Sequence, residues 1–195
     1  MRNRGIVIFA AGLLGALGVG WLGFPAVLYQ RTPQPFQFSH AVHTGEKGGM
    51  KCEDCHALRE DGSFTGIPTL EKCAACHQAP LGTTKDEKYF VERYVTPNRE
   101  IPWEVYSRQP ENVWFSHASH LKLARLACRE CHGDHGKTDK LRPFERNRIS
   151  GYSRDIWGPS IVRLGWQPRR GMKMDDCVEC HHQKGLNHSC MDCHK

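Results

Sequence analysis

The sequence has few residues with which to build an ordinary hydrophobic core. Hydrophobic residues make up 39% of its 195 residues and aromatic residues 9%. About 35 residues at the N-terminus form a separate segment, which leaves roughly 160 for a single compact domain. The formal net charge is +6, but no tract of Lys and Arg is interleaved with aromatic residues. We therefore expect no nucleic-acid partner.

No cysteine lies outside one repeated pattern. The ten cysteines form five copies of C-x-x-C-H, numbered here as sites 1 to 5 in chain order. This string attaches a c-type haem: two thiols form thioethers with the porphyrin, and the His binds the iron as proximal ligand. The residues are Cys52, Cys55 and His56 (site 1), Cys73, Cys76 and His77 (site 2), Cys128, Cys131 and His132 (site 3), Cys177, Cys180 and His181 (site 4), and Cys190, Cys193 and His194 (site 5).

Zinc, a redox dithiol or a disulfide framework explains this pattern less well. A single C-x-x-C could be a redox pair or half of a zinc site. Zinc would need the cysteine pairs to combine in twos, and five is an odd number. Neither zinc nor disulfides explain a His after every second cysteine. The sequence therefore predicts five covalent haems.

Five haems over roughly 160 residues leave about 32 residues for each, too few for a polypeptide core of ordinary size. The porphyrins must then supply most of the buried apolar material. We expect a mostly irregular chain with short α-helices around the five haems.

Residues 1–30 are predicted to form an uncleaved signal-anchor transmembrane helix, and residues 31–195 a periplasmic pentahaem domain. Arg2 and Arg4 precede an uncharged apolar run from Gly5 to Tyr29, which is long enough to cross a bilayer. The run is longer than in most cleavable signal peptides, and no A-x-A-like site follows it. The two arginines favour a cytoplasmic start, so the haem domain should face the periplasm from the bacterial inner membrane.

Two copies of F-S-H-A-x-H, at residues 38–43 and 115–120, lie upstream of haem motifs. Residues three apart share one face of a helix, so the two histidines of each copy can reach two different haems. A further His directly follows the motif His of site 4. The predicted distal ligands are therefore His40, His43, His117, His120 and His182.

His135 and His188 complete the twelve histidines of the chain. They could replace one of the five distal ligands or together bind a sixth, non-covalent haem. Ligation by two histidines leaves no open position on the iron, so no catalytic residue is predicted.

Three stretches connect these motifs. Residues 31–35 read as a short linker that contains proline. Residues 78–112 and 133–176 are long, charged spacers with several prolines. Structureless segments of this length are uncommon inside a compact domain. The arginines and aromatic residues of 133–176 suit an interface with a partner, or the aromatic rings could cover haem faces.

The paired F-S-H-x-x-H segments, the Cys180-His181-His182 string and the density of haem motifs resemble class III multihaem cytochromes c. The pattern over residues 36–136 includes Gly66-Ile67-Pro68 and Ile101-Pro102-Trp103 between the two F-S-H-x-x-H copies. It is similar to the membrane-anchored multihaem subunit of menaquinone reductase (Qrc) and of alternative complex III. This resemblance implies an integral membrane quinone-binding subunit, an iron–sulfur subunit and a molybdopterin-oxidoreductase-like subunit as partners.

The expected function is electron transfer between a soluble periplasmic tetrahaem cytochrome c and menaquinone-reducing subunits, the chain itself being non-catalytic. One alternative is the corresponding subunit of alternative complex III, which would serve quinol oxidation. Another is a self-sufficient, membrane-anchored quinol dehydrogenase. A catalytic multihaem reductase is disfavoured because it needs a five-coordinate iron, and often a C-x-x-C-K motif that this chain lacks.

Overall fold

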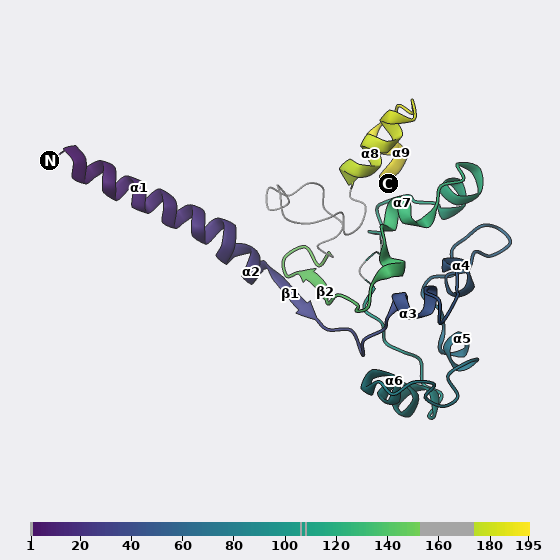
Figure 1. Cartoon of the computed structure of the whole chain (residues 1–195). Coiled ribbons are helices and arrows are strands. Elements are labelled where there is room, and N and C mark those ends of the chain that lie inside the picture. Colours follow the sequence, from purple (N-terminus) through teal and green to yellow (C-terminus); the bar gives the residue numbers. More distant parts are fainter. Residues whose placement is uncertain (1, 106, 108, 153–173) are drawn as a thin grey trace.

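A long helical rod leads into a body of short helices and loops (Figure 1). The computed structural model describes residues 2–105, 107, 109–152 and 174–195. The rod consists of α1 (Arg2–Gly18), the π-helical η1 (Val19–Gly23) and α2 (Phe24–Leu28). Its Arg4–Leu28 portion is long and apolar enough to cross a membrane, a property that a signal sequence shares.

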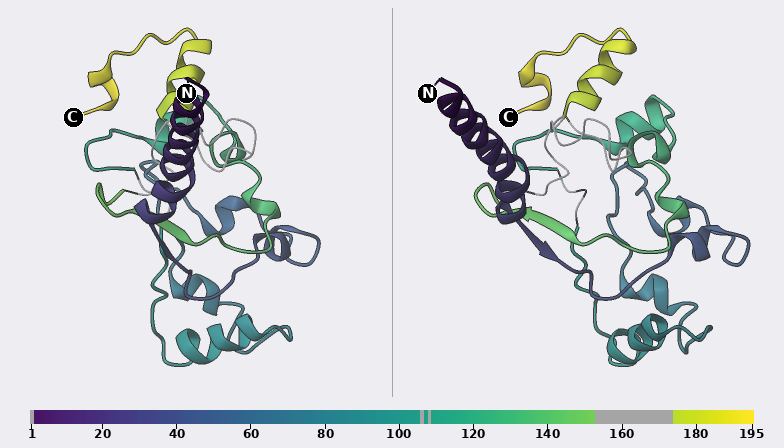
Figure 2. Two further views of the ribbon diagram at one scale, coloured as in Figure 1. Left: turned by 90° about the vertical axis from the view of Figure 1, so that its left-hand side faces the viewer. Right: turned by 60° about the vertical axis from the view of Figure 1, so that its left-hand side comes forward.

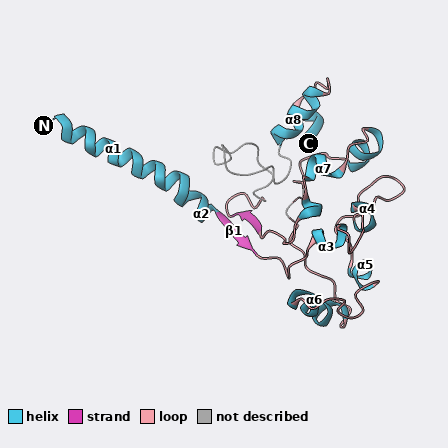
Figure 3. Cartoon of the chain, viewed as in Figure 1, coloured by secondary structure: helices cyan, strands magenta, loops and turns pink. Residues whose placement is uncertain are grey.

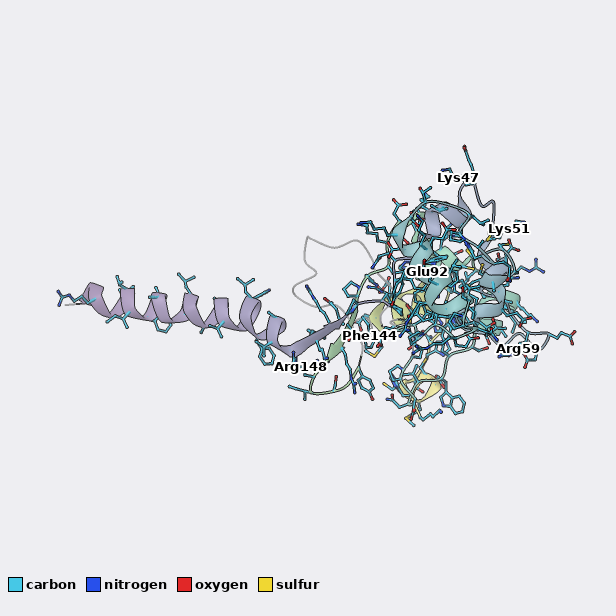
Figure 4. The ribbon with its side chains drawn as sticks, turned by 90° about the horizontal axis from the view of Figure 1, so that it is seen from below. Lys47, Lys51, Arg59, Glu92, Phe144 and Arg148 are labelled. Atoms are coloured by element: carbon cyan, nitrogen blue, oxygen red, sulfur yellow. The ribbon has the colours of Figure 1, made fainter. Side chains whose placement is uncertain are left out.

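A two-stranded antiparallel ribbon joins the rod to the body. β1 (Tyr29–Thr32) pairs with β2 (Phe144–Asn147), with Tyr29 opposite Asn147 and Thr32 opposite Phe144. Figure 4 shows Phe144 and Arg148 at the junction between rod and body. The backbone N–H of Arg148 donates to the Leu28 carbonyl across 2.9 Å. The ribbon therefore ties the end of the rod to a segment more than a hundred residues later in the sequence.

Residues 31–35, which the sequence predicts to be a short linker, connect the rod to the body and are fixed by contacts of their own. Arg31 lies in β1, and its Nε donates to Glu145 Oε1 across 2.7 Å. Gln34 is buried, and its side-chain amide donates to the Glu104 carbonyl (2.9 Å) and accepts from the Glu104 backbone N–H (3.2 Å). A buried amide needs such partners, so this segment is fixed to the body.

The body has little regular structure, as the sequence predicts. Loops join its short helices in Figure 3, and the longest, α8, has ten residues. The helices are α3 (His40–Thr44), α4 (Cys52–Cys55), α5 (Leu70–Ala74), α6 (Lys85–Phe90), η2 (Val91–Val95), η3 (Ser119–Leu123), α7 (Cys128–His132), η4 (His135–Lys137), α8 (Met174–Gln183) and α9 (Cys190–Cys193). Both views of Figure 2 agree with Figure 1 that α6 and α8 lie at opposite ends of the body.

One small apolar cluster lies at the end of the body that contains α5 and α6. Its buried members among the described residues are Phe36, Leu70, Phe90, Val91, Tyr94 and Ile101. The Phe36 ring lies 5.1 Å from that of Phe90 and 4.9 Å from that of Trp103, measured between ring centres. Burial of one such side chain contributes about 1.5–3 kcal/mol, so six cannot order a chain of this length.

The two long spacers contain regular secondary structure that the sequence does not predict. Residues 78–112 are not structureless, because α6 and η2 lie within them and supply Phe90, Val91 and Tyr94 to the apolar cluster. These three positions fall on one face of a continuous helical run. In the second spacer, residues 144–147 form β2. Most of the arginines and tryptophans for which we predicted an interface or haem contacts fall in residues 153–173, outside the described residues.

This small core gives a first prediction. A chain produced without haem attachment should lack a cooperative thermal transition, because the apolar cluster is too small to offset the entropy of ordering the backbone. Circular dichroism melting and amide hydrogen exchange would measure this. A sigmoidal melting curve with slowly exchanging amides in the haem-free chain would contradict the expectation.

Candidate haem centres

Each C-x-x-C-H motif forms one turn of helix. The cysteines of sites 1, 3, 4 and 5 lie in α4, α7, α8 and α9, respectively, whereas site 2 begins at Cys73 in α5 and its Cys76 and His77 follow the end of that helix. At site 1, the backbone N–H of His56 donates to the Cys52 carbonyl across 2.8 Å, and sites 2 and 5 repeat this bond at 3.0 Å. The i to i+4 bond of an α-helix thus joins the first cysteine to the motif histidine. One turn therefore carries all three groups that a c-type haem requires.

An acidic residue before the second cysteine helps to begin three of these turns. Asp54, Glu130 and Asp192 each accept a hydrogen bond from the backbone N–H of the residue before the motif, over 2.7–3.0 Å. At this position, the third residue of the helix, a carboxylate completes part of a capping box. A helix of one turn has few bonds of its own, so these caps stabilise the haem-binding conformation.

The cysteines suit thioether formation better than zinc binding. None of the ten, all in the described part, is in a disulfide. Burial, aided by nearby acidic and thiol groups, raises the pKa of Cys177 to about 11. A thiol with this pKa is protonated at neutral pH in the free chain. Within the described ranges, no three His, Cys, Asp or Glu side chains gather as a metal site.

Three motif histidines face a histidine from elsewhere in the chain. The centres of the His43 and His77 rings are 6.1 Å apart, those of His117 and His132 are 6.5 Å apart, and those of His120 and His181 are 5.9 Å apart. An imidazole nitrogen lies about 2 Å from a bound metal ion. Two imidazoles on opposite sides of one iron therefore have ring centres about 6 Å apart. The three pairs fit this requirement at sites 2, 3 and 4.

The two F-S-H-A-x-H copies have the same local structure. In the first copy, the Phe38 ring meets His40 edge-on at 4.9 Å and stacks on His43 at 4.4 Å. In the second copy, the Phe115 ring meets His117 edge-on and stacks on His120, both at 4.8 Å. The phenylalanine thus orients both histidines of each copy.

The second histidine of each copy is further fixed by its ring nitrogen. His43 Nδ1 lies 2.8 Å from the Ser39 carbonyl oxygen, and His120 Nδ1 lies 2.8 Å from that of Ser116. A carbonyl can only accept, so Nδ1 carries the proton and Nε2 keeps its lone pair for the iron. The sequence repeat therefore has the same local geometry in both copies, and this geometry would suit the predicted distal ligands.

His40 lies near site 1. Burial, followed by the charges of His56, His135 and His43, lowers the pKa of His40 to about 4. The neutral form, which can bind iron, therefore predominates at neutral pH. Because His43 in the same turn faces site 2, α3 presents one histidine to each of two neighbouring sites, and ligation by these two residues stays a prediction. The second copy does the same for sites 3 and 4.

The other histidines considered as distal ligands are His182, His188 and His135. His182 is exposed and has no ring contact with a motif histidine in the described part of the chain. The His188 ring lies 4.6 Å from that of His181, and η4, which carries His135, packs on α3. His135 and His188 thus lie near different sites, an arrangement that does not support a sixth haem shared between them. The distal ligand of site 5 stays a prediction.

Thiols of successive sites lie near one another. Burial is the main cause of the raised pKa of Cys55, Cys128, Cys131 and Cys177, and a thiol of a neighbouring site adds to it in each case. The neighbouring thiols are Cys55 and Cys76, Cys128 and Cys52, Cys131 and Cys180, and Cys177 and Cys193. These electrostatic influences link neighbouring sites in the order 2, 1, 3, 4 and 5.

Sequence reasoning missed two residues that contact the sites. The Phe64 ring lies 6.0 Å from that of His56 and 4.5 Å from that of His117, between sites 1 and 3. Glu87 Oε1 lies 3.1 Å from Nδ1 of the site 2 histidine, His77. A lone Phe gives no sequence signal, but Thr84 and Glu87 form the T-x-x-E signature of a helix start and could have indicated a fixed carboxylate.

The motif turns and facing histidines define a multihaem cytochrome c. Residues 25–101 match the "Class III cytochrome C family", and residues 113–195 match "Cytochrome c7 and related cytochrome c". Covalent haem c is therefore its cofactor. The chain is also 39% identical to the "Menaquinone reductase, multiheme cytochrome c subunit" of Nitratidesulfovibrio vulgaris, over 98% of this chain and 90% of that protein. The chain belongs to this family of menaquinone reductase cytochrome subunits.

The facing pairs give a second prediction. Replacing His43 with Ala should convert the haem of site 2 from low-spin to high-spin, because its iron would lose the distal imidazole. Electron paramagnetic resonance of the oxidised protein would measure a new high-spin signal from one haem. The matched control is Lys47→Ala, an exposed change shortly after α3. An unchanged low-spin spectrum in the His43 variant would contradict the pairing.

Proposed function

We propose that this chain is the electron-transfer subunit of a membrane complex that reduces menaquinone. It would relay electrons through five haems from a soluble periplasmic tetrahaem cytochrome c to quinone-reducing partner subunits. The observation that carries this proposal is the set of three histidine pairs with ring centres 5.9–6.5 Å apart. The relationship to a protein named as a menaquinone reductase subunit supports the same function.

Double histidine ligation supports a relay rather than a catalytic reductase. A haem with two imidazole ligands supplies one-electron chemistry at an iron with no open position. Phe38, Phe115 and the serine carbonyls hold the distal rings in the ligating orientation. Rings fixed in this way need little rearrangement when the charge on the iron changes, which suits rapid electron exchange.

The order of the sites supports a linear path with sites 2 and 5 at its ends. α3 carries histidines that face sites 1 and 2, and residues 117–120 carry those that face sites 3 and 4. Phe64 contacts histidines of sites 1 and 3, the two sites that these helices do not connect. The steps from site 2 to 1, from 1 to 3 and from 3 to 4 therefore each have a structural element shared by the two sites, and Cys177 with Cys193 links site 4 to site 5.

The apolar rod supports attachment to the bacterial inner membrane, with the haem-binding body in the periplasm. Arg2 and Arg4 favour a cytoplasmic start for the rod. The proposed partners are an integral quinone-binding subunit, an iron–sulfur subunit and a molybdopterin-oxidoreductase-like subunit. The chain would then contribute the path for electrons, and its partners would contribute the quinone site.

This division of labour gives a third prediction. The isolated haem-loaded subunit should exchange electrons with a reduced periplasmic cytochrome but should not reduce a menaquinone analogue. Stopped-flow absorbance at the haem bands would measure the first reaction, and loss of quinone absorbance the second. The control is the intact complex, which should perform both.

Other outcomes would identify the alternatives. Quinone reduction or quinol oxidation by the subunit alone would favour a self-sufficient dehydrogenase. Net quinol oxidation by the intact complex, with electrons passing to an acceptor, would favour the function of alternative complex III.

A further inference from the structure

A carboxylate faces the histidine of site 2 from the side away from the predicted haem. Oε1 of Glu87 lies 3.1 Å from Nδ1 of His77, and the two side chains are only 15% and 19% exposed. His77 Nδ1 is buried and makes no well-aligned hydrogen bond with any described group. The separation suits a hydrogen bond but the alignment does not.

The carboxylate is held in place by its surroundings. The backbone N–H groups of Leu81 and Gly82 each donate to Glu87 over 2.8 Å, one to each oxygen. A Cβ at Gly82 would lie only 2.8 Å from Glu87 Oε2, so glycine permits this close approach. Thr84 fixes the start of α6, because its Oγ1 accepts from the Glu87 backbone N–H over 3.2 Å. The carboxylate is therefore fixed relative to His77.

Glu87 is negatively charged at neutral pH. Partial burial acts to raise its pKa, but the hydrogen bonds from Leu81 and Gly82 and the nearby His77 outweigh this effect and hold the pKa below its usual value. A fixed negative charge next to a partly buried imidazole acts more strongly than the same charge in water.

Three other histidines at these sites have a neutral oxygen at Nδ1, whereas His188, which is not a motif histidine, has Asp192 Oδ2 at 3.6 Å. His56 Nδ1 lies 3.3 Å from the Gly66 carbonyl oxygen, while His43 and His120 face serine carbonyls at 2.8 Å. Site 2 therefore differs from site 1, because a carboxylate rather than a neutral carbonyl faces Nδ1 of its motif histidine. A carboxylate that accepts from a metal-bound histidine raises the basicity of that ligand, which stabilises ferric over ferrous iron.

We propose that Glu87 is a positioning residue that lowers the reduction potential of site 2 relative to a site with a neutral partner. This inference rests on the proposed function, in which site 2 is one end of the relay. A low potential at this end favours the electron residing on site 1, next along the path. It makes site 2 suited to accept electrons from a low-potential donor and to pass them inward.

Glu87→Gln tests this role, because Gln keeps an oxygen that can accept hydrogen bonds but removes the charge. In a potentiometric titration of the full-length haem-loaded protein, the titration curve resolves into components, one for each haem. The reduction potential of one component should rise. The expected shift is roughly tenfold in the equilibrium constant, about 59 mV for a one-electron couple. Glu87→Asp keeps the charge and should lie closer to the wild-type value.

Two further variants identify the cause and the site. Glu92→Gln removes the same charge from an exposed position in η2 (Figure 4) and should leave all components nearly unchanged. His43→Met changes the distal ligand of site 2, so the component that it raises identifies this site. Glu87→Gln should move that same component in both the wild-type and the His43→Met background.

Several results would overturn the proposal. These are unchanged potentials in Glu87→Gln, equal shifts in Glu87→Gln and Glu92→Gln, a shift in a component other than that of site 2, or loss of the site 2 haem in Glu87→Gln. Failure of the relay itself would look different. The isolated subunit would then not exchange electrons with a periplasmic cytochrome, whatever the potential of site 2.

Discussion

Iron with two imidazole ligands needs one histidine on each face of the porphyrin, and this requirement links distant parts of the chain. The proximal histidine comes from the motif turn, so the distal one must arrive from elsewhere. His43 faces His77, and His120 faces His181 across a much longer stretch of sequence. With iron bound between its rings, each such pair would act as a cross-link whose strength comes from metal coordination rather than from buried area. A chain with few apolar residues can be ordered in this way.

The apolar cluster around Phe36 lies beside site 2, which is one end of the proposed linear path of haem sites. A haem site in the middle of this path has two neighbouring sites, whereas site 2 has only one, site 1. The remaining side is covered by protein: α6, η2 and residues 101–103 pack around Phe36 there. The His77 ring meets Phe90 of this cluster edge-on at 5.8 Å. The same packing positions Glu87, because α6 carries both Phe90 and Glu87.

Much of this arrangement could be predicted from the sequence. The C-x-x-C-H motifs and the F-S-H-A-x-H repeat are local patterns, and each forms a local turn whose groups are only a few residues apart. The β1–β2 ribbon was not predictable, because Tyr29–Thr32 and Phe144–Asn147 are short and lack a strong alternating pattern. The contact between Glu87 and His77 was also missed, since a loop that wraps around the carboxylate brings the two together.

The ribbon also determines how the body is held relative to the rod. β1 follows α2 without an intervening residue, and β2 is bonded to it by the strand ladder and by the pair Arg31–Glu145. Asn147 is buried, and its side-chain oxygen accepts from the backbone N–H groups of Ile149 and Ser150, over 2.9 and 3.0 Å. Gln34 then fixes the next segment to Glu104. A proposed membrane anchor joined in this way would hold the haem sites at set distances from the bilayer. Electron exchange with a partner in the membrane depends on such distances, so the ribbon suits a subunit of a fixed complex better than a freely tethered carrier.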